Sequence, residues 1–230
     1  ISNFQMALNP QITKNYANSK LEEMEKLTYL GIKFSYMILF FMAFPLSLNI
    51  DYVLHLWLVE VPDYTALFII LILVDSLVGN LFGTPLMTSL SATGKIRNYQ
   101  IAVSVIILCI VPVGYVVLRL GCDASSVFYI TIVFTAISGF VRFLYCRKQI
   151  GYSLRAMLRN VLLPVFGMTV VALPLPIIIK LEYFKTDTWL SFILLSLVAV
   201  VMTFVASWFV GLKANERNML VTMVKNKIHR

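Results

Sequence analysis

Residues 65–88 read TALFIILILVDSLVGNLFGTPLMT, an apolar run interrupted by one ionisable side chain, Asp75. A helix needs about 20 mainly apolar residues to cross the hydrocarbon core of a bilayer. A membrane-spanning strand is shorter and alternates apolar with polar residues, and this run does neither. The run therefore predicts a transmembrane helix.

Five other stretches have a similar length and apolar character, namely residues 29–48, 100–118, 127–146, 160–180 and 188–212. Of the 230 residues 60% are hydrophobic and 13% are charged, whereas soluble domains are about 45–50% apolar and about 25% charged. One soluble core of this size could not bury so much apolar surface. The composition also excludes a disordered chain, collagen, a coiled coil and a nucleic-acid-binding domain. We expect an all-α, polytopic membrane protein with six transmembrane helices and no nucleic-acid partner.

Lysine and arginine are distributed unequally between the two sides of this arrangement. Six spans put both ends of the chain on one side, together with 16 of the 19 cations. These are Lys14, Lys20, Lys26, Lys33, Lys95, Arg97, Arg142, Arg147, Lys148, Arg155, Arg159, Lys213, Arg217, Lys225, Lys227 and Arg230, against Arg119, Lys180 and Lys185 on the other side. Because cytoplasmic loops carry an excess of Lys and Arg, we expect both ends of the chain in the cytoplasm.

Two polar segments flank a predicted transmembrane domain over residues 29–212. Residues 1–28 are predicted to be a cytoplasmic loop with a short amphipathic helix, because Ser19 and Glu22 have the spacing of a capping box before an apolar face. Residues 213–230 form a basic tail that is predicted to lie as a helix on an anionic leaflet. A solvated connector is the alternative for both segments.

Ionisable side chains at membrane depth are costly and are therefore candidates for function. Asp75 lies near the middle of its predicted span, and Asn80 follows five residues later, roughly 140° around the helix. Both are candidates for substrate binding or ion coupling. Asp75 either faces a water-filled cavity, where it binds a proton, a cation or a sugar hydroxyl, or pairs with a cation such as Lys33 or Arg142 to fix helix packing.

Lys33 and Arg142 are expected within a turn or two of the cytoplasmic helix ends. One interpretation is that their side chains extend to the lipid headgroups. The other is that they line a cytoplasm-facing cavity and hold an anionic headgroup such as a pyrophosphate.

Four of the six predicted spans contain residues that interrupt helices. They are Pro45 in the first span, Gly79, Gly83 and Pro85 in the second, Pro112 and Gly114 in the third, and Pro164, Gly167, Pro174 and Pro176 in the fifth. Interrupted helices free backbone groups at a cavity and act as hinges, which is typical of alternating-access transporters. Gly and Pro are also common in membrane helices in general.

The sequence contains no recognisable catalytic or metal-binding pattern. Its three cysteines form no CxxC pair, and its two histidines lie in separate polar segments. Residues 92–95 are superficially similar to a phosphate loop, but the upstream glycine is missing and Ile96 replaces the Ser or Thr that would contact magnesium. We therefore expect no enzymatic activity and no cofactor.

Three sequence motifs resemble one known family. They are LNPQITKNYANSKLEEMEKLT at residues 8–28, HLWLVEVPDYTA at residues 55–66 and ATGKIRNYQ at residues 92–100. Together they resemble the bacterial polysaccharide-biosynthesis flippases for O-antigen and capsule repeat units, in the multidrug/oligosaccharidyl-lipid/polysaccharide exporter superfamily. The later spans match this family in hydropathy and placement.

The resemblance implies a transporter with twelve to fourteen spans, of which this chain is the C-terminal half: the C-terminal lobe from the end of span eight, plus two extra helices. It would carry undecaprenyl-pyrophosphate-linked oligosaccharides to the outer leaflet of the bacterial inner membrane. The implied partners are this lipid-linked oligosaccharide, the bilayer, the N-terminal half of the same protein and a polysaccharide polymerase. The family has no strict motif that assigns roles to the four candidate residues.

Two other functions remain open. A cation-coupled multidrug exporter of the same superfamily would need intramembrane acids, for which Asp75 is the candidate. A non-transporting subunit of a membrane glycan-assembly complex would bind a polymerase without exchanging lipid between leaflets.

Overall fold

The computed structural model describes residues 2–182, 188–214 and 216–218, and every regular element in these ranges is helical. The elements are α1 (Ser2–Ala17), α2 (Leu21–Leu48), α3 (Ile50–Trp57), α4 (Thr65–Leu81), α5 (Thr84–Ala92), α6 (Arg97–Leu108), α7 (Ile110–Arg119), α8 (Ser125–Ile150), α9 (Leu154–Met157), η1 (Leu158–Leu162), α10 (Leu163–Ala172), α11 (Pro174–Glu182), α12 (Trp189–Ala206) and η2 (Ser207–Gly211). The two η elements are single π-helical turns within longer helices.

Within the described residues, six helical segments are long and apolar enough to cross a membrane. They are Leu21–Leu48, Thr65–Ala92, Arg97–Arg119, Ser125–Ile150, Leu154–Glu182 and Trp189–Gly211. The prediction of an all-α, multi-pass membrane protein with six spans is thus confirmed. Five of the segments are longer than predicted from hydropathy, because their helices continue beyond the apolar run into more polar sequence.

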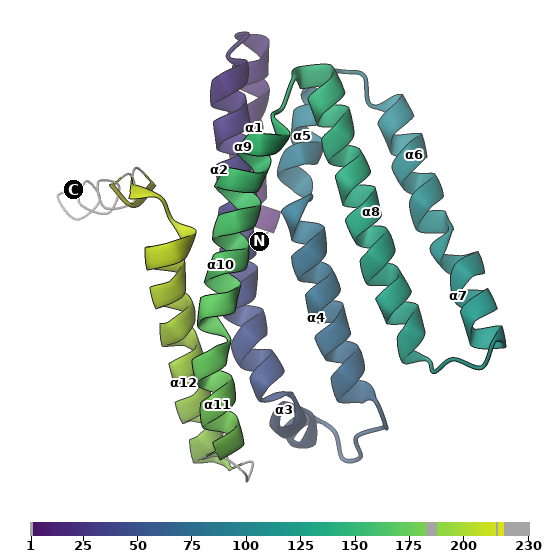
Figure 1. The fold of residues 1–230 in the computed structure, drawn as a ribbon, viewed down its shortest axis with the longest axis vertical. Helices are drawn as coiled ribbons and strands as arrows, with labels where there is room; N and C mark the ends of the chain where they lie inside the picture. Colours follow the sequence, from purple (N-terminus) through teal and green to yellow (C-terminus); the bar gives the residue numbers. More distant parts are fainter. Residues whose placement is uncertain (1, 183–187, 215, 219–230) are drawn as a thin grey trace.

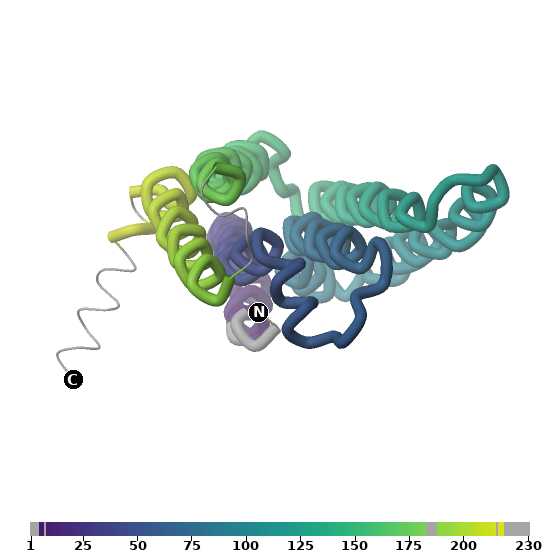
Figure 2. Tube along the Cα trace, turned by 90° about the horizontal axis from the view of Figure 1, so that it is seen from below, coloured from purple at the N-terminus to yellow at the C-terminus, as the bar shows by residue number. Residues whose placement is uncertain are grey.

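Helix α2 lies at the centre of the molecule (Figure 1). The helices α4 and α5 pack on one side of it, with α8 beyond them, and α10 and α12 pack on the other, as the view along the bundle also shows (Figure 2). In the most apolar 18-residue stretch of each span, 61% of the α2 residues are buried inside the protein, compared with 6–22% of the residues in the other spans. The side chains of α2 therefore contact protein while those of the outer helices face outward.

The α4–α5 segment is interrupted at Phe82 and Gly83, close to helix α8. A Cβ atom added at Gly139 of α8 would lie 2.6 Å from the Cβ of Phe82, so only glycine fits there. Phe68 of α4 also stacks on Phe128 of α8, with ring centroids 4.7 Å apart. These contacts fix the register of α4 against α8.

The prediction of a loop over most of residues 1–28 is wrong. Residues 2–17 form helix α1, which packs antiparallel to α2 and also contacts α5 (Figure 1). Ile12 of α1 and Met24 of α2 are both fully buried. Packing thus outweighs Pro10, which lies inside the helix and removes a backbone donor.

The predicted capping box is also absent. Ser19 lies in the left-handed region with φ of 59°, and the residue that precedes α2 is Lys20, which makes no side-chain capping bond. The sequence after it does not form a separate short helix, because α2 runs without a break from Leu21 into the first span. Most of the predicted tail helix lies outside the described residues.

The α1–α2 turn, the α5–α6 loop and the α8–α9 loop lie at the same end of the molecule, which we call the basic end (Figure 1). Its loops and helix ends include Lys14, Lys20, Lys26, Lys95, Arg97, Arg147, Lys148, Arg155 and Arg159. These nine of the sixteen cations that the sequence assigns to one side therefore also lie together in space.

We predict that Gly139→Ala lowers the free energy of unfolding by about 1–3 kcal/mol, because the new methyl group forces α8 away from the Cβ and ring atoms of Phe82. Gly114→Ala is the matched control, since its Cβ would lie 3.8 Å from the nearest atom, an ordinary contact. Denaturant titration in detergent micelles measures both variants. Equal stability of the two variants would contradict this packing constraint.

Candidate functional site

Lys33 is completely buried on the central helix α2. Its ammonium group forms an ion pair with the carboxylate of Glu216, in the short segment that follows η2. The side chain is enclosed by protein and paired with Glu216, which contradicts the interpretation that it extends to the headgroups. Its partner was not predicted from the sequence.

Arg142 of α8 contacts the interruption between α4 and α5. Its Nη1 donates a hydrogen bond to the carbonyl oxygen of Phe82 at 2.6 Å. The last carbonyl groups of a helix lack intrahelical partners and carry partial negative charge, so a guanidinium group stabilises them. Arg142 therefore caps the broken helix, and this contact accounts for a charge at membrane depth.

Asp75 and Asn80 form no ion pair or hydrogen bond that ties them to these cations. Asp75 lies on the α4 stripe between Phe68 and Gly79, both of which face α8. Its Oδ1 and the Oδ1 of Asn80 are shielded from solvent and have no hydrogen-bond partner within the described residues. The predicted alternative of a pair with Lys33 or Arg142 is wrong, since each cation has a different partner.

The four predicted candidates are therefore not assembled into one site. Lys33 joins α2 to the segment after η2, Arg142 caps a helix, and Asp75 and Asn80 lie along α4. The described residues contain no group of His, Cys, Asp and Glu that could hold a metal ion.

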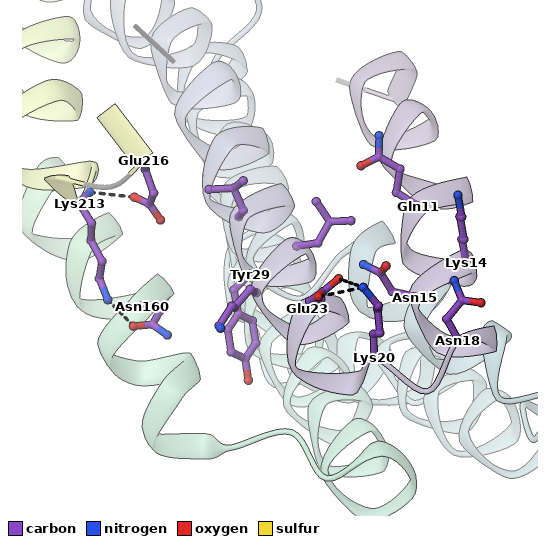
Figure 3. A pocket seen from close by; sticks show the side chains of 13 residues that line it. Gln11, Lys14, Asn15, Asn18, Lys20, Glu23, Tyr29, Asn160, Lys213 and Glu216 are labelled. Carbon is purple, nitrogen blue, oxygen red and sulfur yellow. Dashed lines mark hydrogen bonds and ion pairs between the residues drawn. The ribbon is translucent and has the colours of Figure 1, made fainter. Parts of the chain in front are cut away.

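A cleft whose lining residues are mostly polar lies instead at the basic end, between α1, α2, η1 and the segment after η2. Its volume is about 890 Å³. Figure 3 shows polar side chains of α1 and the α1–α2 turn on one side, with Asn160, Lys213 and Glu216 on the other. The charged residues that line it are Lys14, Lys20, Lys26, Lys213, Glu23 and Glu216. We call this the lysine cleft.

Cations outnumber carboxylates in the lysine cleft. Lys20 pairs with Glu23 at 3.2 Å, and Lys213 donates through its side chain to Asn160. Lys14 and Lys26 have no carboxylate within ion-pair distance in the described part of the chain. Such a cleft can bind a multiply charged anion, because several ammonium groups can donate to its oxygen atoms.

Sequence reasoning counted the lysines of the cleft only as indicators of orientation. They come from α1, the start of α2 and the segment after η2, which are distant in sequence. The spacing of cations in the sequence contains no signal for their assembly, because that depends on α1 folding back along α2.

The α8–α9 loop beside the cleft is held by a buried polar cluster. The Tyr152 hydroxyl donates to Ser89 Oγ at 2.9 Å and lies 3.1 Å from Thr28 Oγ1. Burial raises the pKa of Tyr152 to about 12, so the phenol remains protonated at neutral pH. Tyr29 donates to the carbonyl of Ser153 at 3.1 Å, and Glu25 accepts the Ser153 amide at 2.9 Å.

Residues 92–95, which are superficially similar to a phosphate loop, form a turn with a structural role. Gly94 has φ of +71°, a conformation that favours glycine. Thr93 donates to Gln149 Oε1 at 2.9 Å, and Gln149 donates to the carbonyl of Lys95 at 3.1 Å. The turn therefore fastens the α5–α6 loop to α8.

No protein-family model, no curated protein and no solved structure matches this chain. The resemblance to polysaccharide flippases therefore remains a prediction from the three sequence motifs.

We predict that Arg142→Met lowers the free energy of unfolding by about 1.5–3 kcal/mol, because it leaves the Phe82 carbonyl without a charged donor. Arg147→Met is the matched control: Arg147 lies on the same helix, and its side chain is exposed. The control should stay within about 0.5 kcal/mol of the parent in the same denaturant titration. Similar losses for both variants would show that Arg142 does not cap the broken helix.

Proposed function

We propose that this chain is the C-terminal part of a transporter that moves undecaprenyl-pyrophosphate-linked oligosaccharides across the bacterial inner membrane. The observation that carries the proposal is the lysine cleft at the basic end. Because cytoplasmic loops carry an excess of Lys and Arg, we take this end as cytoplasmic. The cytoplasmic side is where lipid-linked repeat units must enter the transporter. The three sequence motifs support the same family.

The charge of the cleft suits a diphosphate headgroup. Lys14 and Lys26 are unpaired within the described residues, and Lys213 is bonded to an amide rather than to a carboxylate side chain. A diphosphate brings two or more negative charges and several acceptor oxygens. Ammonium groups on flexible stems can follow such a group as it moves.

The interrupted helices support a transport role. The α4–α5 segment breaks at Phe82 and Gly83, and the long fifth span contains a π-helical turn at Leu158–Leu162 and a bend before Pro174. Breaks of this kind let part of a helix move as a rigid body while the rest stays packed. In this proposal the bilayer, the N-terminal half of the protein and a polysaccharide polymerase are the partners.

We predict that the triple variant Lys14→Gln, Lys20→Gln, Lys26→Gln reduces export roughly tenfold. Each exposed charge contact contributes up to about 1 kcal/mol, and 1.4 kcal/mol corresponds to a factor of ten. The measurement is the amount of lipid-linked repeat unit that accumulates on the cytoplasmic leaflet in a host whose own gene is deleted and replaced by the variant.

The matched control is Lys95→Gln, Arg97→Gln, Lys148→Gln, which removes three cations at the basic end but outside the lysine cleft. It should export normally. Normal surface polysaccharide in the deletion host without any complementing gene would refute the proposed function.

A second candidate function, cation-coupled drug export, is favoured by one observation. Asp75 lies within a membrane span with a shielded oxygen that has no partner among the described residues. Intramembrane acids of this kind bind protons or cations in transporters.

For this second function we predict that Asp75→Asn reduces ion-dependent drug efflux at least tenfold, because an amide keeps the shape but cannot carry the charge. Ser76→Ala, the exposed neighbour, is the control and should retain efflux. Efflux assays in cells that express the full-length protein measure both. If the parent exports no drug, the flippase remains the better proposal.

A further inference from the structure

Glu216 connects three parts of the protein that are distant in sequence. Its carboxylate pairs with Lys33 of α2, and its Oε2 accepts the backbone amide of Lys213 at 2.8 Å. The side chain of Lys213 in turn donates to Asn160 of η1. A short segment after the last helix is thus fastened to the central helix.

The buried ammonium group of Lys33 needs an anion. Its side chain is 1% exposed, and an unpaired charge at such a position is strongly destabilising. When Glu216 leaves, Lys33 either pairs with another negative group or gives up its proton. A ligand that keeps Lys33 charged must therefore be an anion.

Glu216 lies between Lys33 and the lysine cleft. Glu216 lines the cleft, whereas Lys33 does not, and the Glu216 side chain is 20% exposed (Figure 3). Departure of the Glu216 carboxylate would therefore open a path from the cleft to Lys33.

We propose that the Lys33 ammonium group and the Lys213 backbone amide form a phosphate-binding site, which the Glu216 carboxylate occupies until a phosphate group replaces it. This inference rests on the proposed function, since the phosphate group would belong to the diphosphate headgroup in the cleft. The exchange keeps Lys33 paired throughout, because one anion replaces another. The released carboxylate remains in a cleft lined by Lys14 and Lys26, whose ammonium groups have no carboxylate partner among the described residues.

Binding of two probes to the purified protein in lipid nanodiscs tests the proposal. Inorganic pyrophosphate reports on the phosphate site alone, and farnesyl diphosphate adds an isoprenyl chain. Tighter binding of farnesyl diphosphate than of pyrophosphate supports a lipid headgroup as the source of the phosphate. Equal binding overturns that source and leaves a free anion as the ligand.

We predict that Glu216→Gln and Glu216→Asp each raise the affinity for pyrophosphate about fivefold or more, at the lower end of ordinary coupling between two binding events. Glu216→Asp shortens the side chain that competes with the phosphate group but keeps its negative charge. It therefore distinguishes a loss of competition from a change in net charge, and it keeps a carboxylate near Lys33. In the double variant Lys33→Met, Glu216→Gln the gain should disappear.

The matched control is Glu23→Gln, which removes the other carboxylate of the same cleft without uncovering Lys33. If Glu23→Gln and Glu216→Gln raise the affinity for pyrophosphate equally and Glu216→Asp does not raise it, Glu216 does not compete for the phosphate site. The lysine cleft itself would still stand as a binding site. Absence of pyrophosphate binding in the parent and every variant overturns the lysine cleft as a headgroup site, and this inference with it.

Discussion

Inside a bilayer no water pairs with backbone groups or charges, so the protein must satisfy them itself. Two helix termini show how the protein does this. The carbonyl of Phe82 at the end of α4 accepts from Arg142, and the carbonyl of Leu48 at the end of α2 accepts from Lys180. Asn49 Nδ2 also donates to the carbonyl of Pro45 at 3.0 Å. Helices can therefore stop or break here because neighbouring side chains supply the missing donors.

The same requirement explains why α2 is central. Several of its polar side chains bind different neighbours. Thr28 lies 2.9 Å from Ser89 of α5, Lys33 pairs with Glu216, and Tyr36 lies 3.1 Å from Thr169 of α10. Van der Waals packing and interhelical hydrogen bonds associate helices in lipid, where the hydrophobic effect between them is weak. A helix with partners on several sides thus holds the two groups of helices together.

Hydropathy predicts all six spans because lipid imposes one length and one polarity on every crossing helix. It does not predict α1, whose sequence contains Pro10 and many polar residues and whose stability comes from the contact of Ile12 with its neighbours. The apolar context of Lys33 and Arg142 marks them in the sequence as costly charges. Their partners are not predictable from sequence, because Glu216 and the Phe82 carbonyl come from distant segments that only the fold brings together.

Helix α1 also determines what the cations of the basic end can do. A cation that only orients the chain acts through the charge of its whole loop, so its position within that loop matters little. A cation that holds a phosphate oxygen must reach it at hydrogen-bond distance. The packing of α1 along α2 brings Lys14 to the same cleft as Lys26, and the segment after η2 adds Lys213 from the opposite side. The fold thus gathers cations from three segments of the sequence into one cleft.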